Sequence, residues 1–309
     1  MALLSFPILL NHLAVPPHSA STGSRCCVID PERQAALLID AHVHLHDCFQ
    51  LDSFFEQAHR NFEGAAREHG WDPAVGVLML TESEGVDWFG RLAGLAAGSG
   101  FDRDARLTSW TVEATRDPAA LMAASGGRRL LLVAGRQVVA REGLEVLLLG
   151  TRSSVPDGRP IRDVLAEGDR LGALRVIPWG AGKWLFGRGK LLNELIAAAH
   201  PGNGFFLGDG AGRPFFWSKP RHFDHAERQG IRILPGTDPL PFPRQTGRAG
   251  SFGFRLDGAV DLSSPIEGIK SALRNPDARL TPFGRPERLA PFVRNQIAMQ
   301  RRKRGRRRP

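Results

Sequence analysis

The sequence predicts an α/β protein built as a single (β/α) barrel of about seven to eight parallel strands with an inserted β-ribbon. Short apolar runs alternate with helical segments along most of the chain, which favours parallel strands joined by helices. The length of 309 residues suits one barrel domain, and no internal repeat divides it. A doubly wound parallel sheet fits the same alternation and is the alternative architecture.

The first part of the barrel is predicted from two strands and two helices. The apolar residues 37–39 begin a buried strand that continues through His42. Residues 51–69 are predicted to form an amphipathic helix, because phenylalanines and alanines recur there at helical spacing. Residues 75–80 are continuously apolar, as expected of a strand covered on both faces. The next helix is expected at residues 85–97.

The segment that follows departs from this alternation. Residues 106–114 are predicted as a third strand, and residues 119–124 are too short for a helix. The apolar runs 129–134, 137–141 and 144–150 are separated by only two residues each. Turns this tight predict antiparallel hairpins, so we interpret these runs as a strand with an inserted β-ribbon.

Regular alternation then resumes until about Pro243. Helices and strands are expected in turn, with helices at 161–171, 189–200 and 219–229 and strands at 173–178, 204–208 and 230–234. Signals weaken afterwards, with a strand at 251–256 and a helix at 265–273. The proline-rich remainder to Pro291 is expected to wrap the outside.

The two ends of the chain are expected to lie outside this domain, which spans residues 31–295. Residues 1–30 are predicted to be a poorly ordered extension. Residues 296–309 are predicted to be a basic disordered tail, because the last nine residues carry seven of the nine net positive charges. Such a tail gives only weak grounds for nucleic-acid binding, since no aromatic residues lie among its charges.

The remaining composition favours a cytoplasmic protein. Three cysteines with no Cys-x-x-Cys motif do not make a disulfide framework, so a reducing compartment is expected. No apolar stretch is long enough to span a membrane. The expected partner is therefore a small-molecule substrate.

A pair of histidines marks the end of the first predicted strand. His42 and His44 are two residues apart, and side chains at this spacing point to the same face of a strand. Two imidazoles on a rigid strand form half of a site for a divalent metal. His46 would share this face only if the strand continued beyond Leu45.

Carboxylates follow other predicted strands and complete the candidate site. Functional groups of an α/β barrel gather at the carboxyl ends of its strands, where Glu82, Asp209 and Asp238 are expected. With the two histidines they would bind a divalent metal, Zn²⁺ foremost, with Mn²⁺ or Fe²⁺ as alternatives. Glu84 competes with Glu82 for this role, and both aspartates also fit ordinary turn chemistry.

Basic residues in two glycine-rich loops are candidates for substrate binding. Glycine lets backbone amides approach an anion, and Lys183, Arg188 and Arg213 could bind a phosphate or carboxylate of the substrate. The alternative is that they are surface charges on loops.

These residues resemble the motifs of barrel-shaped metal-dependent hydrolases, namely the amidohydrolase superfamily and the polymerase-and-histidinol-phosphatase (PHP) phosphoesterases. Both groups carry a His-x-His at the end of the first strand, often after Asp, as in Asp40-Ala41-His42-Val43-His44. Both carry an Asp at the end of the last strand, which Asp238 resembles. The resemblance is weak in the middle of the chain, because no histidine lies at the ends of strands three to seven.

The function expected from these residues is metal-dependent hydrolysis of a small amide or phosphate ester by a metal-activated water. Asp238 would take the proton of that water as general base. The alternative is a non-catalytic barrel, descended from such hydrolases, that binds a ligand or partner.

Overall fold

The computed structural model describes residues 36–72, 74–99, 107–199, 204–215, 217–258 and 260–306. The predicted extension at residues 1–30 lies outside the described residues. Among those described, the strands form two sheets, one of seven strands and one of five. No helix in these ranges is both long and apolar enough to cross a membrane.

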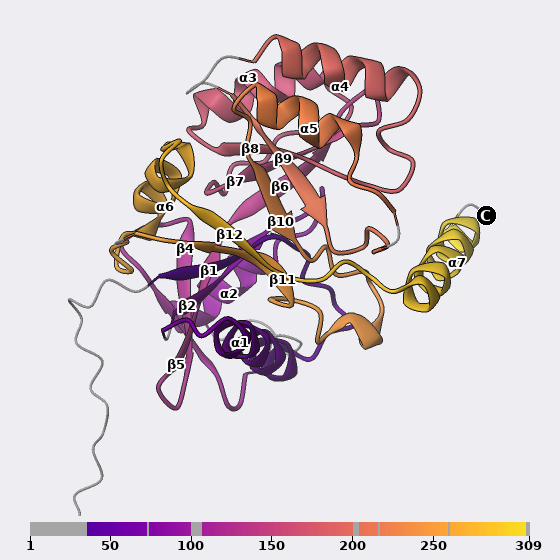
Figure 1. The fold of residues 1–309 in the computed structure, drawn as a ribbon. Helices are drawn as coiled ribbons and strands as arrows, with labels where there is room; N and C mark the ends of the chain where they lie inside the picture. The colour runs from indigo at the N-terminus through magenta and orange to yellow at the C-terminus, as the bar shows by residue number, and fades with distance from the viewer. Residues whose placement is uncertain are drawn as a thin grey trace, which may run out of the picture. The chain divides into compact units, whose positions relative to one another are not determined.

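The larger sheet mixes parallel and antiparallel strands in the order β12-β11-β1-β2-β5-β4-β3 (Figure 1). Its strands are β1 (Leu37–Val43), β2 (Val75–Leu80), β3 (Thr111–Ala114), β4 (Ala120–Ser125), β5 (Arg128–Val133), β11 (Phe252–Leu256) and β12 (Leu280–Gly284). Strands β1, β2 and β5 run parallel, whereas β11 is antiparallel to β1 and β4 is antiparallel to β5.

The smaller sheet has the order β10-β9-β8-β7-β6. Its strands are β6 (Gly135–Val139), β7 (Glu145–Leu149), β8 (Leu174–Pro178), β9 (Phe206–Gly210) and β10 (Ile233–Gly236). Strands β8, β9 and β10 are parallel, and β7 is antiparallel to both β6 and β8.

The prediction of a single closed (β/α) barrel is therefore wrong, and so is the doubly wound parallel sheet. A parallel crossover needs a dozen or more residues, whereas the links from β3 to β4, from β4 to β5 and from β6 to β7 are much shorter. Gly126 and Gly127 both have positive φ angles and turn β4 directly into β5. The predicted ribbon is present as the β6–β7 hairpin, but β5 and β6 belong to different sheets.

Seven helices and one short 3-10 segment are found among the described residues. They are α1 (Leu51–Glu68), α2 (Trp88–Ala96), α3 (Ile161–Arg170), α4 (Gly187–Ala197), α5 (Arg221–Arg228), η1 (Pro243–Gln245), α6 (Pro265–Arg274) and α7 (Leu289–Arg306). The predicted disordered tail from residue 296 is thus helical through Arg306.

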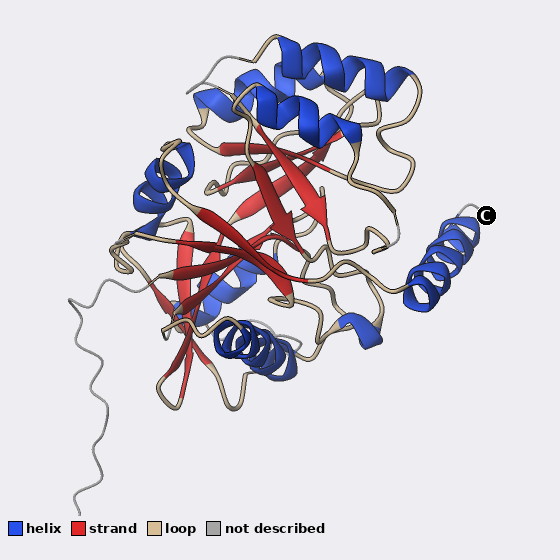
Figure 2. Cartoon of the chain, in the orientation of Figure 1, coloured by secondary structure: helices blue, strands red, loops and turns tan. Residues whose placement is uncertain are grey.

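The helices and sheets enclose three groups of buried apolar side chains. Helices α1 and α2 pack on one face of the larger sheet, and α3, α4 and α5 pack on one face of the smaller sheet (Figure 2). The third group lies between the sheets, where Ile39 of β1, Val77 of β2 and Val176 of β8 meet Ile269 of α6. Alternation along each strand places successive side chains in different groups. This packing brings the carboxyl ends of β1 and β10 together.

Candidate metal centre

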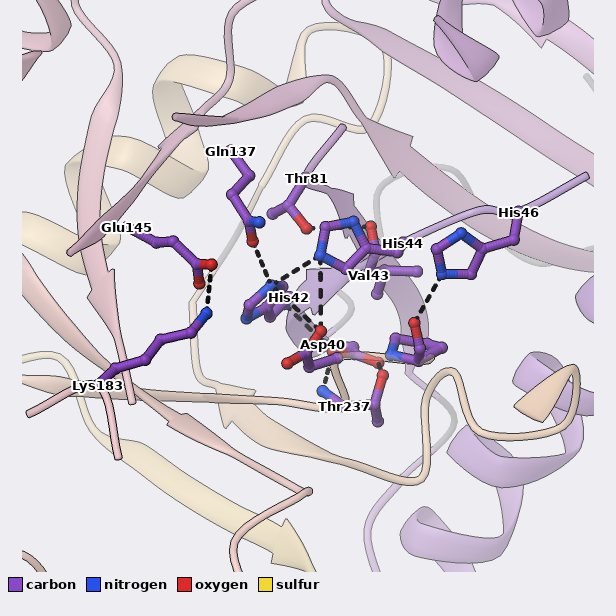
Figure 3. A network of polar contacts seen from close by, with 12 residues as sticks. Asp40, His42, Val43, His44, His46, Thr81, Gln137, Glu145, Lys183 and Thr237 are labelled. Atoms are coloured by element: carbon purple, nitrogen blue, oxygen red, sulfur yellow. Dashed lines mark hydrogen bonds and ion pairs between the residues drawn. The ribbon is translucent and has the colours of Figure 1, made fainter. Parts of the chain in front are cut away.

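Three electron-rich atoms converge where β1 and β10 end (Figure 3). The Nε2 atoms of His42 and His44 lie 3.1 Å apart. Asp238 Oδ1 lies 3.7 Å from His42 Nε2 and 3.5 Å from His44 Nε2. Ligands about 2.1 Å from a tetrahedral Zn²⁺ are separated by about 3.4 Å, so the chemistry and spacing of these donors fit a divalent cation.

The backbone holds the two strand ends in close contact. The N–H of Asp238 donates a 2.8 Å hydrogen bond to the carbonyl oxygen of His42. At Gly236, a Cβ atom would lie 2.4 Å from the backbone nitrogen of His42, so only glycine allows this approach. Asp238 itself has a φ of 47°, a left-handed conformation that Asp adopts more readily than most residues. Its carboxylate is thereby aimed at the two imidazoles.

Asp40 fixes the loop after β10 from below the histidines. This side chain is fully buried, and burial raises its pKa to about 6 although four donors lower it. It accepts hydrogen bonds from Thr237 N at 2.8 Å, Thr237 Oγ1 at 2.6 Å and Gly250 N at 2.8 Å. Asp40 therefore positions the chain on either side of Asp238 and has no free place for a metal.

Burial and charge keep the candidate ligands in the protonation states that a metal requires. Burial, with the charge of His42 as a second cause, lowers the pKa of His44 to about 3, so this imidazole is neutral and its nitrogen can bind a cation. Burial raises the pKa of Asp238, but His42, His44 and Lys183 outweigh it, and the net pKa lies below its usual value. Asp238 is therefore a carboxylate at neutral pH.

Sequence reasoning missed a fourth polar group at this site. Gln137 of β6 places Oε1 3.3 Å from His42 Nε2. Beside it, Glu145 at the start of β7 forms an ion pair with Lys183 (Figure 3). Glutamine and glutamate within a predicted hairpin carry no motif, and the crossing of β6 near β1 depends on the arrangement of the two sheets.

His46 lies beside the group but is occupied elsewhere. Its ring stacks on that of His44, with centroids 5.7 Å apart, and its Nε2–H donates to the carbonyl oxygen of Pro239 at 2.9 Å. This bond ties the loop after β1 to the loop that carries Asp238.

The other two predicted carboxylate ligands make ion pairs instead. Glu82 accepts a hydrogen bond from Phe89 N at 2.6 Å and pairs with Arg136 at 3.0 Å. Asp209 accepts hydrogen bonds from Nε and Nη2 of Arg213, at 2.9 and 2.8 Å. Neither belongs to the group of converging ligand atoms found among the described residues. Glu82 follows β2 as predicted, whereas Asp209 lies within β9, and neither arginine partner could be foreseen from spacing.

The predicted substrate-binding residues are likewise separated. Lys183 points toward the histidines and pairs with Glu145 (Figure 3), whereas Arg213 forms an ion pair with Asp209. Arg188 donates to the carbonyl oxygen of Gly182 at 2.9 Å. Only Lys183 of the three is near enough to affect the pKa of Asp238.

A small cavity of about 80 Å³ adjoins the candidate ligands. Asp238 and Thr237 form one part of its wall, and glycines of the loops after β8 and β9 form another. Gln245 and Arg248 add polar side chains. The cavity has room for a small polar group next to the Asp238 carboxylate.

Comparison with known proteins gives structural similarities only. The sequence matches no protein-family profile and no curated protein sequence. Among solved structures it is similar to PsfC from Pseudomonas syringae PB-5123, with a TM-score of 0.52, 15% identity, and coverage of 86% of this chain and 98% of PsfC.

Two endonuclease Q structures are also similar. A lesion-specific endonuclease Q from Pyrococcus furiosus has a TM-score of 0.47 and 12% identity over 79% of this chain and 57% of its own. An endonuclease Q complex with a 27-mer duplex carrying an abasic lesion has a TM-score of 0.42 and 14% identity over 77% and 56%. The chain thus spans little more than half of either endonuclease Q chain. The similarity to PsfC concerns the fold alone and extends over 98% of its chain.

Proposed function

We propose that this protein is a divalent-metal-dependent hydrolase whose metal ligands are His42, His44 and Asp238. The observation that carries the proposal is the separation of their three ligand atoms by 3.1 to 3.7 Å, close to the spacing around a tetrahedral ion. Two imidazoles and one carboxylate favour Zn²⁺, with Mn²⁺ and Fe²⁺ as alternatives. Three protein ligands leave a position open for water, as catalytic zinc sites do.

The residues around the site have distinct roles in the proposed reaction. A divalent cation held by His42, His44 and Asp238 would lower the pKa of a coordinated water to about 7 and would polarise the bond to be cleaved. Asp238 is ionised and lies at the mouth of the cavity, so it accepts the proton as general base. Asp40 orients the Asp238 loop through Thr237.

The proposed substrate is a small amide or phosphate ester. The cavity beside Asp238 is small and lined largely by backbone and polar side chains. Lys183 projects toward His42 and offers a positive charge to the developing negative charge of the substrate. Because Lys183 is paired with Glu145, that charge is partly neutralised before substrate binds.

Hydrolysis by protein depleted of metal and then supplied with Zn²⁺, Mn²⁺ or Fe²⁺ tests this proposal. We would use bis(p-nitrophenyl) phosphate and a p-nitroanilide as probes. Turnover on one of them should require metal and should fall about 100-fold or more in Asp238→Asn, while Asp47→Asn, whose carboxylate is exposed, should retain it. Stoichiometric metal binding with no turnover on either probe would instead favour a non-catalytic binding protein.

A further inference from the structure

Helix α7 turns apolar side chains outward. Leu289, Val293 and Ile297 are spaced four residues apart and therefore share one face of the helix. They are 52%, 43% and 48% exposed. Together with Ala290 and Ala298 they line an open apolar groove. We call these five residues the α7 stripe.

The side of α7 opposite the stripe carries one buried polar residue. Asn295 is 2% exposed, donates to Glu287 at 3.0 Å and accepts from Arg244 at 2.9 Å. A helix at the surface of a globular protein normally buries its apolar side and exposes its polar side. In α7 the polar side chain of Asn295 is buried, whereas Leu289, Val293 and Ile297 are exposed. Contiguous exposed apolar surface of this kind marks an interaction site.

The net positive charge of the chain is concentrated in the C-terminal segment that includes α7. Residues 288–309 contain nine arginines and lysines and no acidic residue, whereas residues 1–287 contain 32 of each sign and are neutral. Arg294, Arg301 and Arg244 are exposed and line the same groove as the stripe. The partner must therefore combine an apolar interior with a negative surface.

We propose that the α7 stripe docks on a bilayer that contains anionic lipid. Aliphatic side chains enter the acyl boundary while neighbouring arginines meet the phosphates of the headgroups, as in other basic amphipathic helices. Trp217, 44% exposed, contacts Phe292 of α7 and adds an aromatic ring of the type enriched at membrane interfaces. The helix would lie on the surface, in keeping with the finding that no described helix can span it.

Two other occupants fit the observations less well. A second copy of this chain would bring two such faces together, and their like charges would repel. Nucleic acid satisfies the arginines but gives Leu289, Val293 and Ile297 nothing apolar to contact, since its binding sites rely on phosphate contacts and base stacking.

Vesicle flotation with the full-length protein tests the proposal. Vesicles of phosphatidylcholine alone are compared with vesicles that also contain about 30% phosphatidylglycerol, which gives them a negatively charged surface. Wild type should bind the anionic vesicles at least about tenfold more tightly. Val293→Ser/Ile297→Ser and Arg294→Gln/Arg301→Gln should each weaken this binding about tenfold or more.

Matched variants distinguish binding through the α7 stripe from nonspecific binding through other exposed apolar or charged side chains. Leu185→Ser/Phe186→Ser removes exposed apolar surface elsewhere, and Arg60→Gln/Arg170→Gln removes two exposed charges from α1 and α3. Both should bind like wild type. Equal binding to the two kinds of vesicle, or full binding by Val293→Ser/Ile297→Ser, overturns the proposal. So does self-association that the stripe variant abolishes, or binding of a labelled DNA duplex in preference to anionic vesicles.

Discussion

The backbone N–H of Asp238 donates a 2.8 Å hydrogen bond to the carbonyl oxygen of His42. This backbone hydrogen bond links two candidate ligands that are 196 positions apart in the sequence, and it does so independently of any metal. Because His42 ends a buried strand and Asp238 follows another, the geometry of the site depends on how closely β1 and β10 approach. Changes to that approach should alter metal binding and stability together.

Gly236→Ala should disturb this approach directly. The added Cβ would lie 2.4 Å from His42 N and 2.6 Å from His42 Cβ, and neither atom can rotate away. We expect a loss of about 1–3 kcal/mol in the free energy of unfolding, measured by urea denaturation, and weaker metal binding. Gly212→Ala is the control, since no atom lies within 4 Å of its added Cβ. Equal stability of the two variants would show that β1 and β10 can separate without penalty.

Asp40→Asn should destabilise the protein although it changes almost no volume. One carboxylate oxygen accepts from Thr237 N, and the other accepts from Thr237 Oγ1 and Gly250 N. The NH₂ group of asparagine would face a donor where a carboxylate oxygen had accepted a hydrogen bond, which should reduce the free energy of unfolding by about 2 kcal/mol or more. Asp47→Asn, at an exposed position, controls for the lost charge. A variant as stable as this control would mean that Asp40 does not hold the Asp238 loop.

Most of the candidate site was predictable because it depends on local patterns. The two-residue spacing of His42 and His44 on a strand places both imidazoles on one side, and an aspartate after a late strand lies at the same edge. Gln137 was not predictable, because its position near His42 results from the crossing of two sheets. Glu82 follows β2 as expected and Asp209 lies within β9, but the ion pairs that they form with Arg136 and Arg213 could not be predicted from spacing.

Many helices and strands could be predicted from the sequence, but the arrangement of the strands into sheets could not. Helix α1 and strand β2 follow from apolar periodicity alone, because each buries the side that its pattern defines. Residues 120–125 consist mainly of alanine, leucine and methionine, which favour helices, yet they form β4 between β3 and β5. Pairing on both edges outweighs that preference, and these antiparallel partners prevent a barrel of parallel strands.

Gln137 should contribute to metal affinity through its amide oxygen, which lies 3.3 Å from His42 Nε2. We expect Gln137→Leu to weaken Zn²⁺ binding about tenfold, and Gln137→Glu to restore or strengthen it because a carboxylate is the better ligand or hydrogen-bond acceptor. Competition with a chromogenic chelator measures both. Gln137→Leu with unchanged affinity and Gln137→Glu with lowered affinity would exclude this role.

Glu82 should make stability depend on pH near neutrality. The side chain is 3% exposed, and burial raises its pKa to about 7, against about 4.5 in the unfolded chain, even though Phe89 N–H and Arg136 lower it. The folded state therefore binds the proton of Glu82 more tightly than the unfolded chain does. The resulting stabilisation of the folded state is complete below pH 4.5 and is lost as the pH rises through 7. The free energy of unfolding should lose about 3 kcal/mol over this range.

Glu82→Gln removes the titrating group and tests this pH dependence. The stability of Glu82→Gln relative to wild type should increase from pH 5 to pH 8, as followed by urea denaturation at each pH. The exposed Glu84→Gln variant accounts for the change in net charge. A difference between Glu82→Gln and wild type that stays constant over this range would contradict the raised pKa.

Isothermal titration of the metal-depleted protein with Zn²⁺ tests the central claim most directly. Wild type should bind the metal stoichiometrically, and His42→Ala/His44→Ala should lose at least about 100-fold in affinity while remaining folded by circular dichroism. His222→Ala/His225→Ala, which removes two histidines from α5, should bind as wild type does. Equal affinity of wild type and His42→Ala/His44→Ala would contradict a metal centre formed by His42, His44 and Asp238.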